Sequence, residues 1–519
     1  MAALSKSRYT LSCQCQKALW LNTYKPEEAV VDPSVEERFA EGQVVGDLAK
    51  SLFSDYVDTT TYTDGGELDI AAMIDKTKEL VNSGCPVICE AAFAPEHHYC
   101  AVDILRKEDA GWAIYEVKSK SSKVDDDYTN PEFGKYAIDI AYQRWVLEQC
   151  GICVTGTYLV TINSDYVRRG ELVLKTTDSG NGLFNIIDLG PIVENEYQKV
   201  PNQSLQALQT LEQTTELEMP LSIHCHKPYH CAFWKHCTSH LPKPSVFDVH
   251  NIKFTTKLEH YHAGRISFND LAGKNIGKIQ DMQINCTINQ VDHINFAGIQ
   301  KFLDKVSYPL YFLDFESMQS AVPIYDNTNP YMQICFQYSL HYVECAGGEL
   351  QHKAFLAQND GSDPRRPLAE ALCRDIPRGA CIMVYNKSFE QTCIKKMAAI
   401  YPDLKAHLMD IHAHIIDLQE PFKGGHYLRP AMCGTFSTAN GMFSIKSVLP
   451  ALFPDDPNLD YHNLSTMVQN GGDAKSIFPK IQNMSLEEAA KARQALLDYC
   501  HLDTLAMFKI WERLKELVK

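Results

Sequence analysis

Charged residues at alternate positions of two apolar, β-type runs are the feature that most constrains this chain. The run "WAIYEVKSK" carries Glu116 and Lys118, and the run "PLYFLDFES" carries Asp314 and Glu316. Side chains at positions i and i+2 of a strand lie on one face, so the members of each pair are neighbours. A buried strand seldom carries two acids without a metal ion, so the second run in particular indicates a functional site.

Size and charge limit the classes of protein to consider. With 519 residues, the chain has room for roughly three domains. Its 49 Lys and Arg against 65 Asp and Glu give a net charge of −16, so DNA binding would depend on local basic patches. No segment reaches the roughly 18 apolar residues of a membrane helix, and the N-terminus lacks the apolar core of a signal peptide. We therefore expect a cytoplasmic protein with no membrane partner and mostly reduced cysteines.

A proline-containing segment divides the chain into domains. The segment "SHLPKPSVFDV" follows a stretch dense in cysteine and histidine and predicts a domain boundary. We expect a first domain over residues 1–245, a small connecting region over 246–305 and a further domain over 306–519. The last of these opens with "SYPLYFLDFESM" and closes on a long helical pattern.

The first candidate site lies on a predicted hairpin. The β-type runs "YCAVDILRK" and "WAIYEVKSK" are separated by the turn-like "EDAG", so Asp103 can approach Glu116 and Lys118. Two carboxylates can hold a divalent cation, and a lysine beside them can orient the attacking water or stabilise charge that develops on a phosphate. The alternative interpretation is an exposed strand edge that carries ordinary charges.

Asp103 followed by Glu116-x-Lys118 after a β-turn resembles the core of the PD-(D/E)XK nucleases. Upstream, "RFAEGQVVGDLAKSLF" is similar to the first helix of the RecB-type members. Downstream, "YAIDIAYQRWVLEQCG" is similar to their glutamine-bearing helix, and Gln143 matches the motif glutamine. The resemblance implies an α/β, restriction-endonuclease-like fold. It also implies that Asp103 and Glu116 hold a metal ion and that Lys118 and Gln143 act in catalysis.

Two positions depart from the RecB-type pattern. Gly46, four residues after Gly42, stands where many relatives carry a metal-binding histidine, and Leu147 stands where the motif usually has tyrosine. Glu41 is a candidate substitute for the missing histidine ligand.

Three evenly spaced cysteines form a separate cluster. In "IHCHKPYHCAFWKHC", Cys225, Cys231 and Cys237 are separated by two equal gaps, which is metal-ligand spacing. Cys15 is the candidate fourth ligand, with Cys13 a less favoured neighbour. Inert thiols are one alternative. Zinc is another, because four histidines lie in the same segment: His224, His226, His230 and His236.

One N-terminal cysteine and a later trio around a RecB-type core resembles the iron–sulfur nucleases, among them CRISPR-associated and AddB-type enzymes. The resemblance implies that Cys15, Cys225, Cys231 and Cys237 bind a [4Fe–4S] cluster that joins the two ends of the domain.

The C-terminal part repeats a paired-acid pattern in a longer motif. Asp314 and Glu316 lie on an apolar strand, Glu390 lies at a strand–helix junction with Asn386 and Phe389, and "DYCHLD" sets Tyr499 one helical turn before Asp503. This order resembles the DEDDy exonucleases of RNase H-like fold. The resemblance implies that the four carboxylates bind two divalent ions and that Tyr499 positions the attacking water.

Several further features qualify this pattern. Glu390 replaces the aspartate usual in that family, and Asp417 is either an auxiliary acid or an ordinary loop charge. Lys446 and Ser447 either contact a phosphate backbone or begin an amphipathic helix. The alternative interpretation of the whole pattern is that these acids are scattered over the surface and form no site.

Taken together, the chain resembles a little-characterised bacterial family that fuses a RecB-like iron–sulfur nuclease domain to a DEDDy-type exonuclease domain. The resemblance implies a nuclease that uses Mg²⁺ or Mn²⁺ and acts on DNA, on single-stranded ends, in repair, recombination or defence. It implies 3′ to 5′ polarity for the C-terminal domain. The alternatives are a nucleic-acid-binding scaffold with one or both sites inactive, and an RNA exonuclease.

Overall fold

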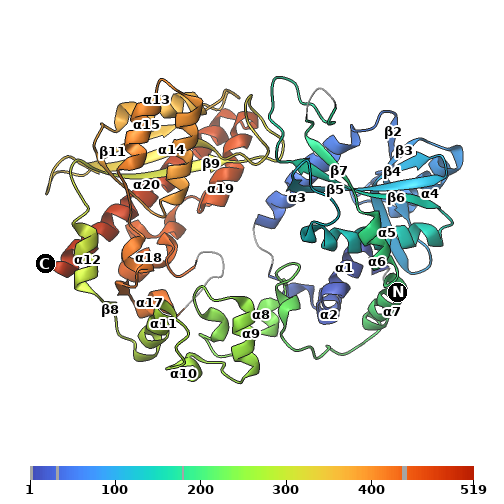
Figure 1. Ribbon diagram of the computed structural model, residues 1–519, viewed down its shortest axis with the longest axis horizontal. Coiled ribbons are helices and arrows are strands. Elements are labelled where there is room, and N and C mark those ends of the chain that lie inside the picture. Colours follow the sequence, from blue (N-terminus) through green and yellow to red (C-terminus); the bar gives the residue numbers. More distant parts are fainter. Residues whose placement is uncertain (1–3, 31–33, 178–180, 435–440) are drawn as a thin grey trace. The chain divides into compact units, whose positions relative to one another are not determined.

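The computed structural model describes residues 4–30, 34–177, 181–434 and 441–519 (Figure 1). The chain forms two compact units of mixed α/β structure. The first unit contains Met1–His240 and Ser320–Met332, and the second contains Leu241–Gln319 and Gln333–Lys519. The region that we predicted as a connector, 246–305, thus lies in the second unit.

A seven-stranded sheet forms the centre of the first unit. Its strands follow the order β2-β3-β4-β5-β6-β7, and the short β1 pairs in parallel with β4. The predicted hairpin is confirmed, since β4 and β5 are antiparallel and joined by a tight turn. The strands are β1 (Leu4–Ser5), β2 (Tyr56–Asp58), β3 (Val87–Phe93), β4 (His98–Glu108), β5 (Gly111–Ser122), β6 (Val154–Asn163) and β7 (Phe184–Asp188).

Helices cover the sheet of the first unit. Helix α5 is buried over most of its length because its apolar residues, such as Ile140 and Val146, pack on the sheet core. Helix α1 begins directly after β1, where the Ser5 hydroxyl caps the helix by accepting a hydrogen bond from the Arg8 N–H. The helices are α1 (Lys6–Gln14), α2 (Gln16–Tyr24), α3 (Ser34–Lys50), α4 (Ile70–Ser83), α5 (Gly134–Gln149), α6 (Gly190–Tyr197), α7 (Val200–Leu211) and α8 (Trp234–Cys237).

The second unit contains a five-stranded mixed sheet with the order β11-β10-β9-β12-β13. The first strand of this sheet in the sequence, β9, is central; it runs parallel to β12 and antiparallel to β10. A separate pair of short strands, β8 and β14, is antiparallel. The strands are β8 (His293–Ile294), β9 (Leu310–Met318), β10 (Ile334–Val343), β11 (Gln351–Leu356), β12 (Cys381–Val384), β13 (Ile415–Asp417) and β14 (Tyr427–Leu428).

Both faces of this sheet are covered by helices. Leu313 and Phe315 pack with the helices α13–α15, whereas Phe312, on the opposite face, contacts Phe508 and Trp511 of α20. The alternation of a strand therefore turns Asp314 toward α20. The helices are α9 (Phe254–His262), α10 (Phe268–Leu271), α11 (Lys278–Asn289), α12 (Phe296–Leu303), α13 (Arg365–Asp375), α14 (Ser388–Ile400), α15 (Lys405–Ala413), α16 (Glu420–Lys423), α17 (Pro430–Cys433), α18 (Ile445–Leu452), α19 (Gly471–Ile477) and α20 (Leu486–Val518).

Helix α20 is long, and a capping box between Ser485 and Glu488 fixes its first turn. None of the helices within the described ranges combines the length and the apolar character that a membrane crossing requires.

Candidate functional site

Four acidic side chains converge in the second unit. Asp314 and Glu316 come from β9, Glu390 from the first turn of α14, and Asp503 from α20. Glu316, Glu390 and Asp503 are each less than a tenth exposed. The pKa of each of the four carboxyl groups is raised. The charges of Asp503 and Glu390 contribute to the shift at Asp314, and those of Asp314 and Asp503 contribute at Glu316. The structure therefore brings together the four carboxylates that the sequence singled out.

Burial is the dominant electrostatic influence on this acid cluster, and the charges of neighbouring acids add to it at Asp314 and Glu316. Burial, with Asp503 and Glu390 nearby, holds the pKa of Asp314 well above its usual range. Burial raises the pKa of Asp503 to about 6 and that of Glu390 to about 8. One oxygen of Glu390, Oε2, is buried without a hydrogen-bond partner among the described residues. Such an arrangement is expected where a bound cation supplies the missing positive charge.

The tyrosine that we predicted lies beside these acids, together with a second one. Tyr499 is buried one helical turn before Asp503, and the Tyr461 hydroxyl donates a hydrogen bond to Asp503 Oδ1 at 2.5 Å. The Lys446 ammonium lies over both rings, 5.1 Å from the Tyr461 centroid and 5.2 Å from the Tyr499 centroid. Burial lowers the pKa of Lys446, while the acids Asp503, Glu316 and Asp314 oppose that shift. Lys446 is thus a basic group facing the cluster.

Two further residues lie next to the cluster: Cys500, which the sequence patterns did not single out, and Asp417, for which they left an auxiliary acid and an ordinary loop charge as alternatives. The Cys500 thiol lies 3.5 Å from Asp314 Oδ2, and the ligand atoms of Cys500, Asp314 and Glu316 all lie within 4.8 Å of one another. Asp417 accepts hydrogen bonds from the Asn386 and Gln419 N–H groups, each at 2.9 Å. Asp417 therefore holds the turn that precedes α14, which positions Glu390.

Ser447, the other candidate phosphate contact beside Lys446, forms a hydrogen bond within the protein. The Ser447 hydroxyl donates to the carbonyl of Gly441 at 3.0 Å, and Ser444 caps α18. The amphipathic helix that we considered at this point is α18, with Lys446 in its first turn.

The raised carboxyl pKa values predict a pH dependence of stability. A carboxyl group whose pKa is raised in the folded state stabilises the fold fully at pH values below its pKa in the unfolded state, which is near 4. This contribution is lost as the pH rises through the pKa of the folded state. In metal-free protein, Asp314→Asn should therefore raise the unfolding temperature relative to wild type more at pH 8 than at pH 5. Thermal unfolding in chelator at both pH values measures this. A difference that is constant or larger at pH 5 would contradict the described electrostatics.

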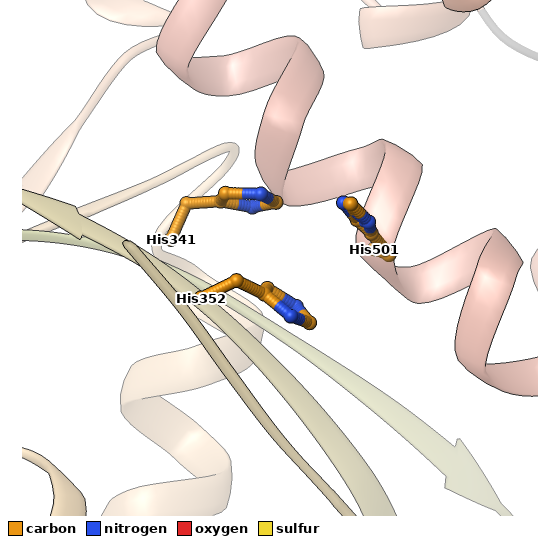
Figure 2. Close-up of side chains that lie close together, drawn as sticks. All are labelled: His341, His352 and His501. Carbon is orange, nitrogen blue, oxygen red and sulfur yellow. The ribbon is translucent and has the colours of Figure 1, made fainter. Parts of the chain in front are cut away.

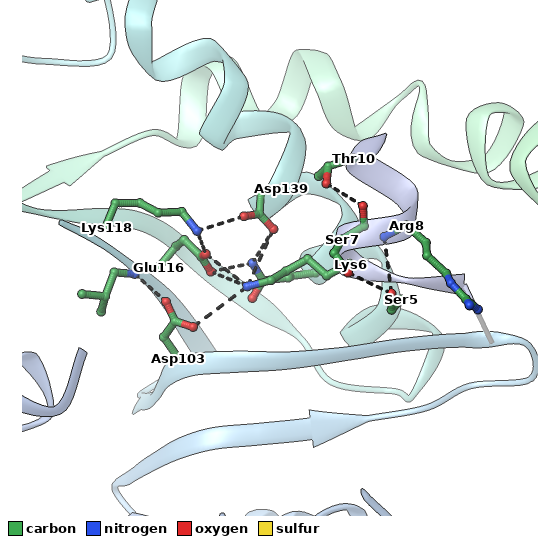
Figure 3. Close-up of polar contacts among 11 residues, drawn as sticks. Ser5, Lys6, Ser7, Arg8, Thr10, Asp103, Glu116, Lys118 and Asp139 are labelled. Atoms are coloured by element: carbon green, nitrogen blue, oxygen red, sulfur yellow. Dashed lines mark hydrogen bonds and ion pairs between the residues drawn. The ribbon is translucent and has the colours of Figure 1, made fainter. Parts of the chain in front are cut away.

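The hairpin site of the first unit is built differently, because each acid there has a basic partner (Figure 3). Glu116, which is fully buried, receives hydrogen bonds from Lys118 and from Gln143 Nε2, the latter at 2.7 Å. Asp103 accepts a hydrogen bond from the Val117 N–H at 2.7 Å. All four residues that we predicted for this site therefore lie within one group.

Three further charged residues, which sequence reasoning missed, complete this group. The Lys6 ammonium lies 3.1 and 3.2 Å from the two oxygens of Glu116, and 4.0 Å from Asp103 Oδ1 (Figure 3). Asp139, one helical turn before Gln143 on α5, contacts Lys118 at 3.2 Å and Lys6 at 3.8 Å. Burial and the charge of Asp103 raise the pKa of a third residue, Glu90, to about 7.

Two ammonium groups offset part of the negative charge of the hairpin site. Burial alone would raise the pKa of Glu116, but Lys118 and Lys6 outweigh burial and hold this pKa well below its usual range. Burial and the Glu116 charge raise the pKa of Asp103 to about 6. Burial would lower the pKa of Lys6, yet Asp139, Glu116 and Asp103 hold it above its ordinary value. Lys6 thus occupies the position between carboxylates that a divalent cation would also favour.

The structure shows what surrounds Gly46 and Leu147, the two positions that depart from the RecB-type pattern. A Cβ atom added at Gly46 would meet no atom within 4 Å, so the missing side chain leaves open space. The proposed substitute, Glu41, accepts a hydrogen bond from the Ala321 N–H at 2.9 Å and is engaged there. Leu147 is fully buried in the core that α5 forms with the sheet.

Removal of Lys6 tests whether its ammonium competes with a metal ion. In an Asp314→Asn background, which removes one carboxylate from the acid cluster of the second unit, Lys6→Ala should tighten Mn²⁺ binding by about tenfold, because one positive charge leaves a buried carboxylate pair. Isothermal titration calorimetry measures the affinity. Lys120→Ala, an exposed lysine two residues beyond Lys118, is the control. Unchanged or weaker Mn²⁺ binding by Lys6→Ala would contradict competition.

The four predicted cysteine ligands line one cavity in the first unit. Cys15 lies at the break between α1 and α2, and the trio Cys225, Cys231 and Cys237 follows at and before α8. Gln14 ties the two segments together by donating to the carbonyl groups of His224 and Tyr229, at 2.8 and 2.7 Å.

The thiols around this cavity influence one another. Burial raises the pKa of Cys237 to about 11, and the neighbouring thiols Cys231, Cys15 and Cys225 add to the shift. His236 is held between Glu28 and Glu216, with Nε2 2.9 Å from Glu216 Oε1, so both ring nitrogens face acids. Positive charge from a metal centre would favour the thiolate forms. Cys13 instead lies near Gln203, with its sulfur 3.7 Å from Oε1.

Comparison with known proteins finds relatives whose functions are not assigned. Residues 311–437 match a domain of unknown function, DUF2779, and this range contains Asp314, Glu316 and Glu390. The chain is 28% identical over 242 residues to the uncharacterized protein UU173 of Ureaplasma parvum serovar 3, which covers 43% of this chain and 33% of the relative. It is also 28% identical over 234 residues to the uncharacterized MG366 homolog of Mycoplasma pneumoniae, with 42% and 33% covered. The matches thus span about a third of the length of these relatives.

Proposed function

We propose that this protein is a metal-dependent nuclease that hydrolyses DNA from single-stranded ends. The observation that carries the proposal is the acid cluster Asp314, Glu316, Glu390 and Asp503. The last three acids are buried, and Lys446 is the basic neighbour of the cluster. Four carboxylates with raised pKa values in one place are costly unless a cation binds them. Oxygen-rich ligand sets of this kind suit Mg²⁺ and Mn²⁺.

The fold of the second unit supports an RNase H-like exonuclease domain. In this proposal the central strand β9 presents Asp314 and Glu316, and the helices α14 and α20, one from each side of the sheet, supply Glu390 and Asp503. The order of acids along the chain, with Tyr499 before the last one, is that of the DEDDy group. A 3′ to 5′ polarity follows from this resemblance.

Each residue of the acid cluster has a defined task in this mechanism. Asp314, Glu316, Glu390 and Asp503 would hold two divalent ions. When bound, these ions supply the positive charge that stabilises the attacking and leaving oxygens of an in-line displacement at phosphorus. The Tyr499 hydroxyl, buried beside Asp503, orients the attacking water. Tyr461 fixes the Asp503 carboxylate through its 2.5 Å hydrogen bond. Lys446 lies where it can contact a phosphate oxygen.

The hairpin site fits a second, weaker nuclease centre. Asp103 and Glu116 would hold one ion there, Lys118 would orient water or stabilise the phosphate, and Gln143 would fix Glu116. The absence of a histidine at position 46 predicts that manganese supports this centre better than magnesium. Lys6 would have to move away from Glu116 before an ion binds.

The cysteine cavity fits an iron–sulfur cluster. A single zinc ion holds thiolates at about 2.3 Å, so its four sulfur atoms would lie within about 4 Å of one another. A [4Fe–4S] cluster is larger and holds its four thiolates farther apart. The family resemblance implies such a cluster, and the fact that Cys15, Cys225, Cys231 and Cys237 line one cavity supports it, with zinc as the alternative.

One observation favours a second candidate function for the first unit. Lys6 and Lys118 already neutralise most of the charge on Asp103, Glu116 and Asp139, as they would in an inactive centre. The first unit would then be a nucleic-acid-binding scaffold that carries DNA to the second. RNA is the alternative substrate, since nothing in the acid cluster selects against a 2′-hydroxyl group.

A single assay tests the proposal. Purified protein is incubated with end-labelled single-stranded DNA and RNA, with Mg²⁺ or Mn²⁺ and then with chelator. We expect shortening of DNA from its 3′ end that depends on the metal ion. Binding without cleavage of either nucleic acid would favour the scaffold, and cleavage of RNA alone would favour the RNA exonuclease.

A further inference from the structure

Three histidines that are distant in the sequence meet beside the sheet of the second unit (Figure 2). His341 on β10 and His352 on β11 are cross-strand partners, and His501 comes from α20. The ring centroids are 4.5 Å apart for His341 and His352, 4.6 Å for His341 and His501, and 4.5 Å for His352 and His501. One nitrogen of each ring lies within 4.8 Å of one nitrogen of the other two.

Hydroxyl groups orient two of the three rings. Thr504 Oγ1 lies 2.8 Å from His341 Nδ1, and Ser339 Oγ lies 2.9 Å from His352 Nε2. The two hydroxyls are themselves 2.8 Å apart. Each of these imidazoles therefore has one nitrogen fixed by a hydroxyl and a second nitrogen left over, which is the usual situation of a metal-binding histidine.

The third ring lacks a partner where one is expected. His501 Nε2 is buried and has no hydrogen-bond partner among the described residues. A buried polar nitrogen without a partner is costly, and neither of the other two rings compensates for it through a hydrogen bond. A ligand held jointly by the three rings would satisfy this nitrogen.

The histidines are also in the protonation state that binds metal ions. Burial lowers the pKa of His341 to about 3, with the neighbouring His352 and His501 adding to the shift. Partial desolvation of the ring and the neighbouring His501 lower the pKa of His352 to about 4. A lowered pKa favours the neutral imidazole, which is the form that binds a metal ion.

We propose that His341, His352 and His501 form a binding site for a transition-metal ion of the zinc class, separate from the acid cluster. Three imidazoles leave a fourth tetrahedral position for water or another ligand, and His352 is exposed, so an ion can enter from solvent. The ion links the β10–β11 hairpin to α20. It thereby fixes the helix that carries Tyr499 and Asp503, although the site does not depend on nuclease activity.

The test compares full-length wild-type protein with His352→Ala, because this exposed ligand can be removed without opening the core. The control is His462→Ala, a histidine whose side chain is 90% exposed. Chelator-treated proteins are titrated with Zn²⁺ by calorimetry, and their unfolding temperatures are measured with and without Zn²⁺. Other zinc sites, including the cysteines and the acid cluster, remain intact in all three proteins and cancel in the comparison.

We expect wild type and His462→Ala to bind one more Zn²⁺ ion per chain than His352→Ala, or to bind it at least about tenfold more tightly. Zinc should also raise the unfolding temperature of these two proteins by more than that of His352→Ala. Equal stoichiometry, equal affinity and an equal temperature shift in all three proteins would overturn the proposal, and the cluster would then be a packing of neutral rings.

Discussion

Asp314→Asn should lower DNA hydrolysis by about a hundred- to a thousandfold while the protein still folds. Asparagine keeps the size of the side chain but removes the charge that the acid cluster offers to a metal ion. Because Asp314 lies among like charges, its neutralisation also relieves repulsion, so stability without metal should be unchanged or higher. Initial rates on labelled single-stranded DNA with Mg²⁺, together with thermal unfolding, measure both effects.

Asp498→Asn is the matched control for this variant, since Asp498 lies on the same helix as Asp503 but is exposed. It should cleave DNA as wild type does. Loss of activity in both variants would show that the effect is not specific to the acid cluster. Wild-type trimming of 3′ ends by Asp314→Asn would show that the acid cluster is not the exonuclease centre.

Cys225→Ser should abolish the cofactor and sharply reduce the yield of folded protein. Cys225 is the most buried of the four thiols around the cavity, and thiolate–metal bonds there would join the start of the chain to residues 225–237. Anaerobically purified wild type should be brown and carry about four iron ions per chain. The variant should be nearly free of iron and unfold at a lower temperature.

The exposed Cys153→Ser serves as the control, and it should retain both iron and colour. Wild-type protein that is colourless and holds one zinc ion per chain would refute the iron–sulfur cluster while leaving a four-thiolate site in place. Full retention of iron by Cys225→Ser would remove this residue from the ligand set.

Local sequence patterns predicted the parts of both sites that lie on regular elements. The alternation of β-strands placed Asp314 beside Glu316, and the β-turn placed Asp103 near Glu116, because side-chain direction follows from the strand period alone. Helical spacing likewise placed Tyr499 near Asp503. The pairing of Cys15 with the later trio came from a family resemblance, and all four residues line one cavity.

Residues brought in by tertiary structure were not predicted. Lys6 reaches Glu116 only because β1 pairs with β4 and starts α1 beside the hairpin, and a two-residue strand leaves no recognisable pattern. Asp139 could have been noticed, since it precedes Gln143 by one helical turn. The three-histidine site had no sequence signal, because cross-strand pairing and a distant helix bring its members together.

In the function that we propose, the acid cluster of the second unit hydrolyses DNA and the hairpin site is at most a second centre. The most direct measurement compares four proteins on one 5′-labelled single strand with Mn²⁺: wild type, Asp314→Asn, Lys118→Ala and the double variant. We expect Asp314→Asn to remove the ladder of 3′-shortened products and Lys118→Ala to leave this ladder intact. Any cleavage that remains in Asp314→Asn should disappear in the double variant. A full 3′ ladder from Asp314→Asn, lost only when Lys118 is also replaced, would place the exonuclease at the hairpin site instead.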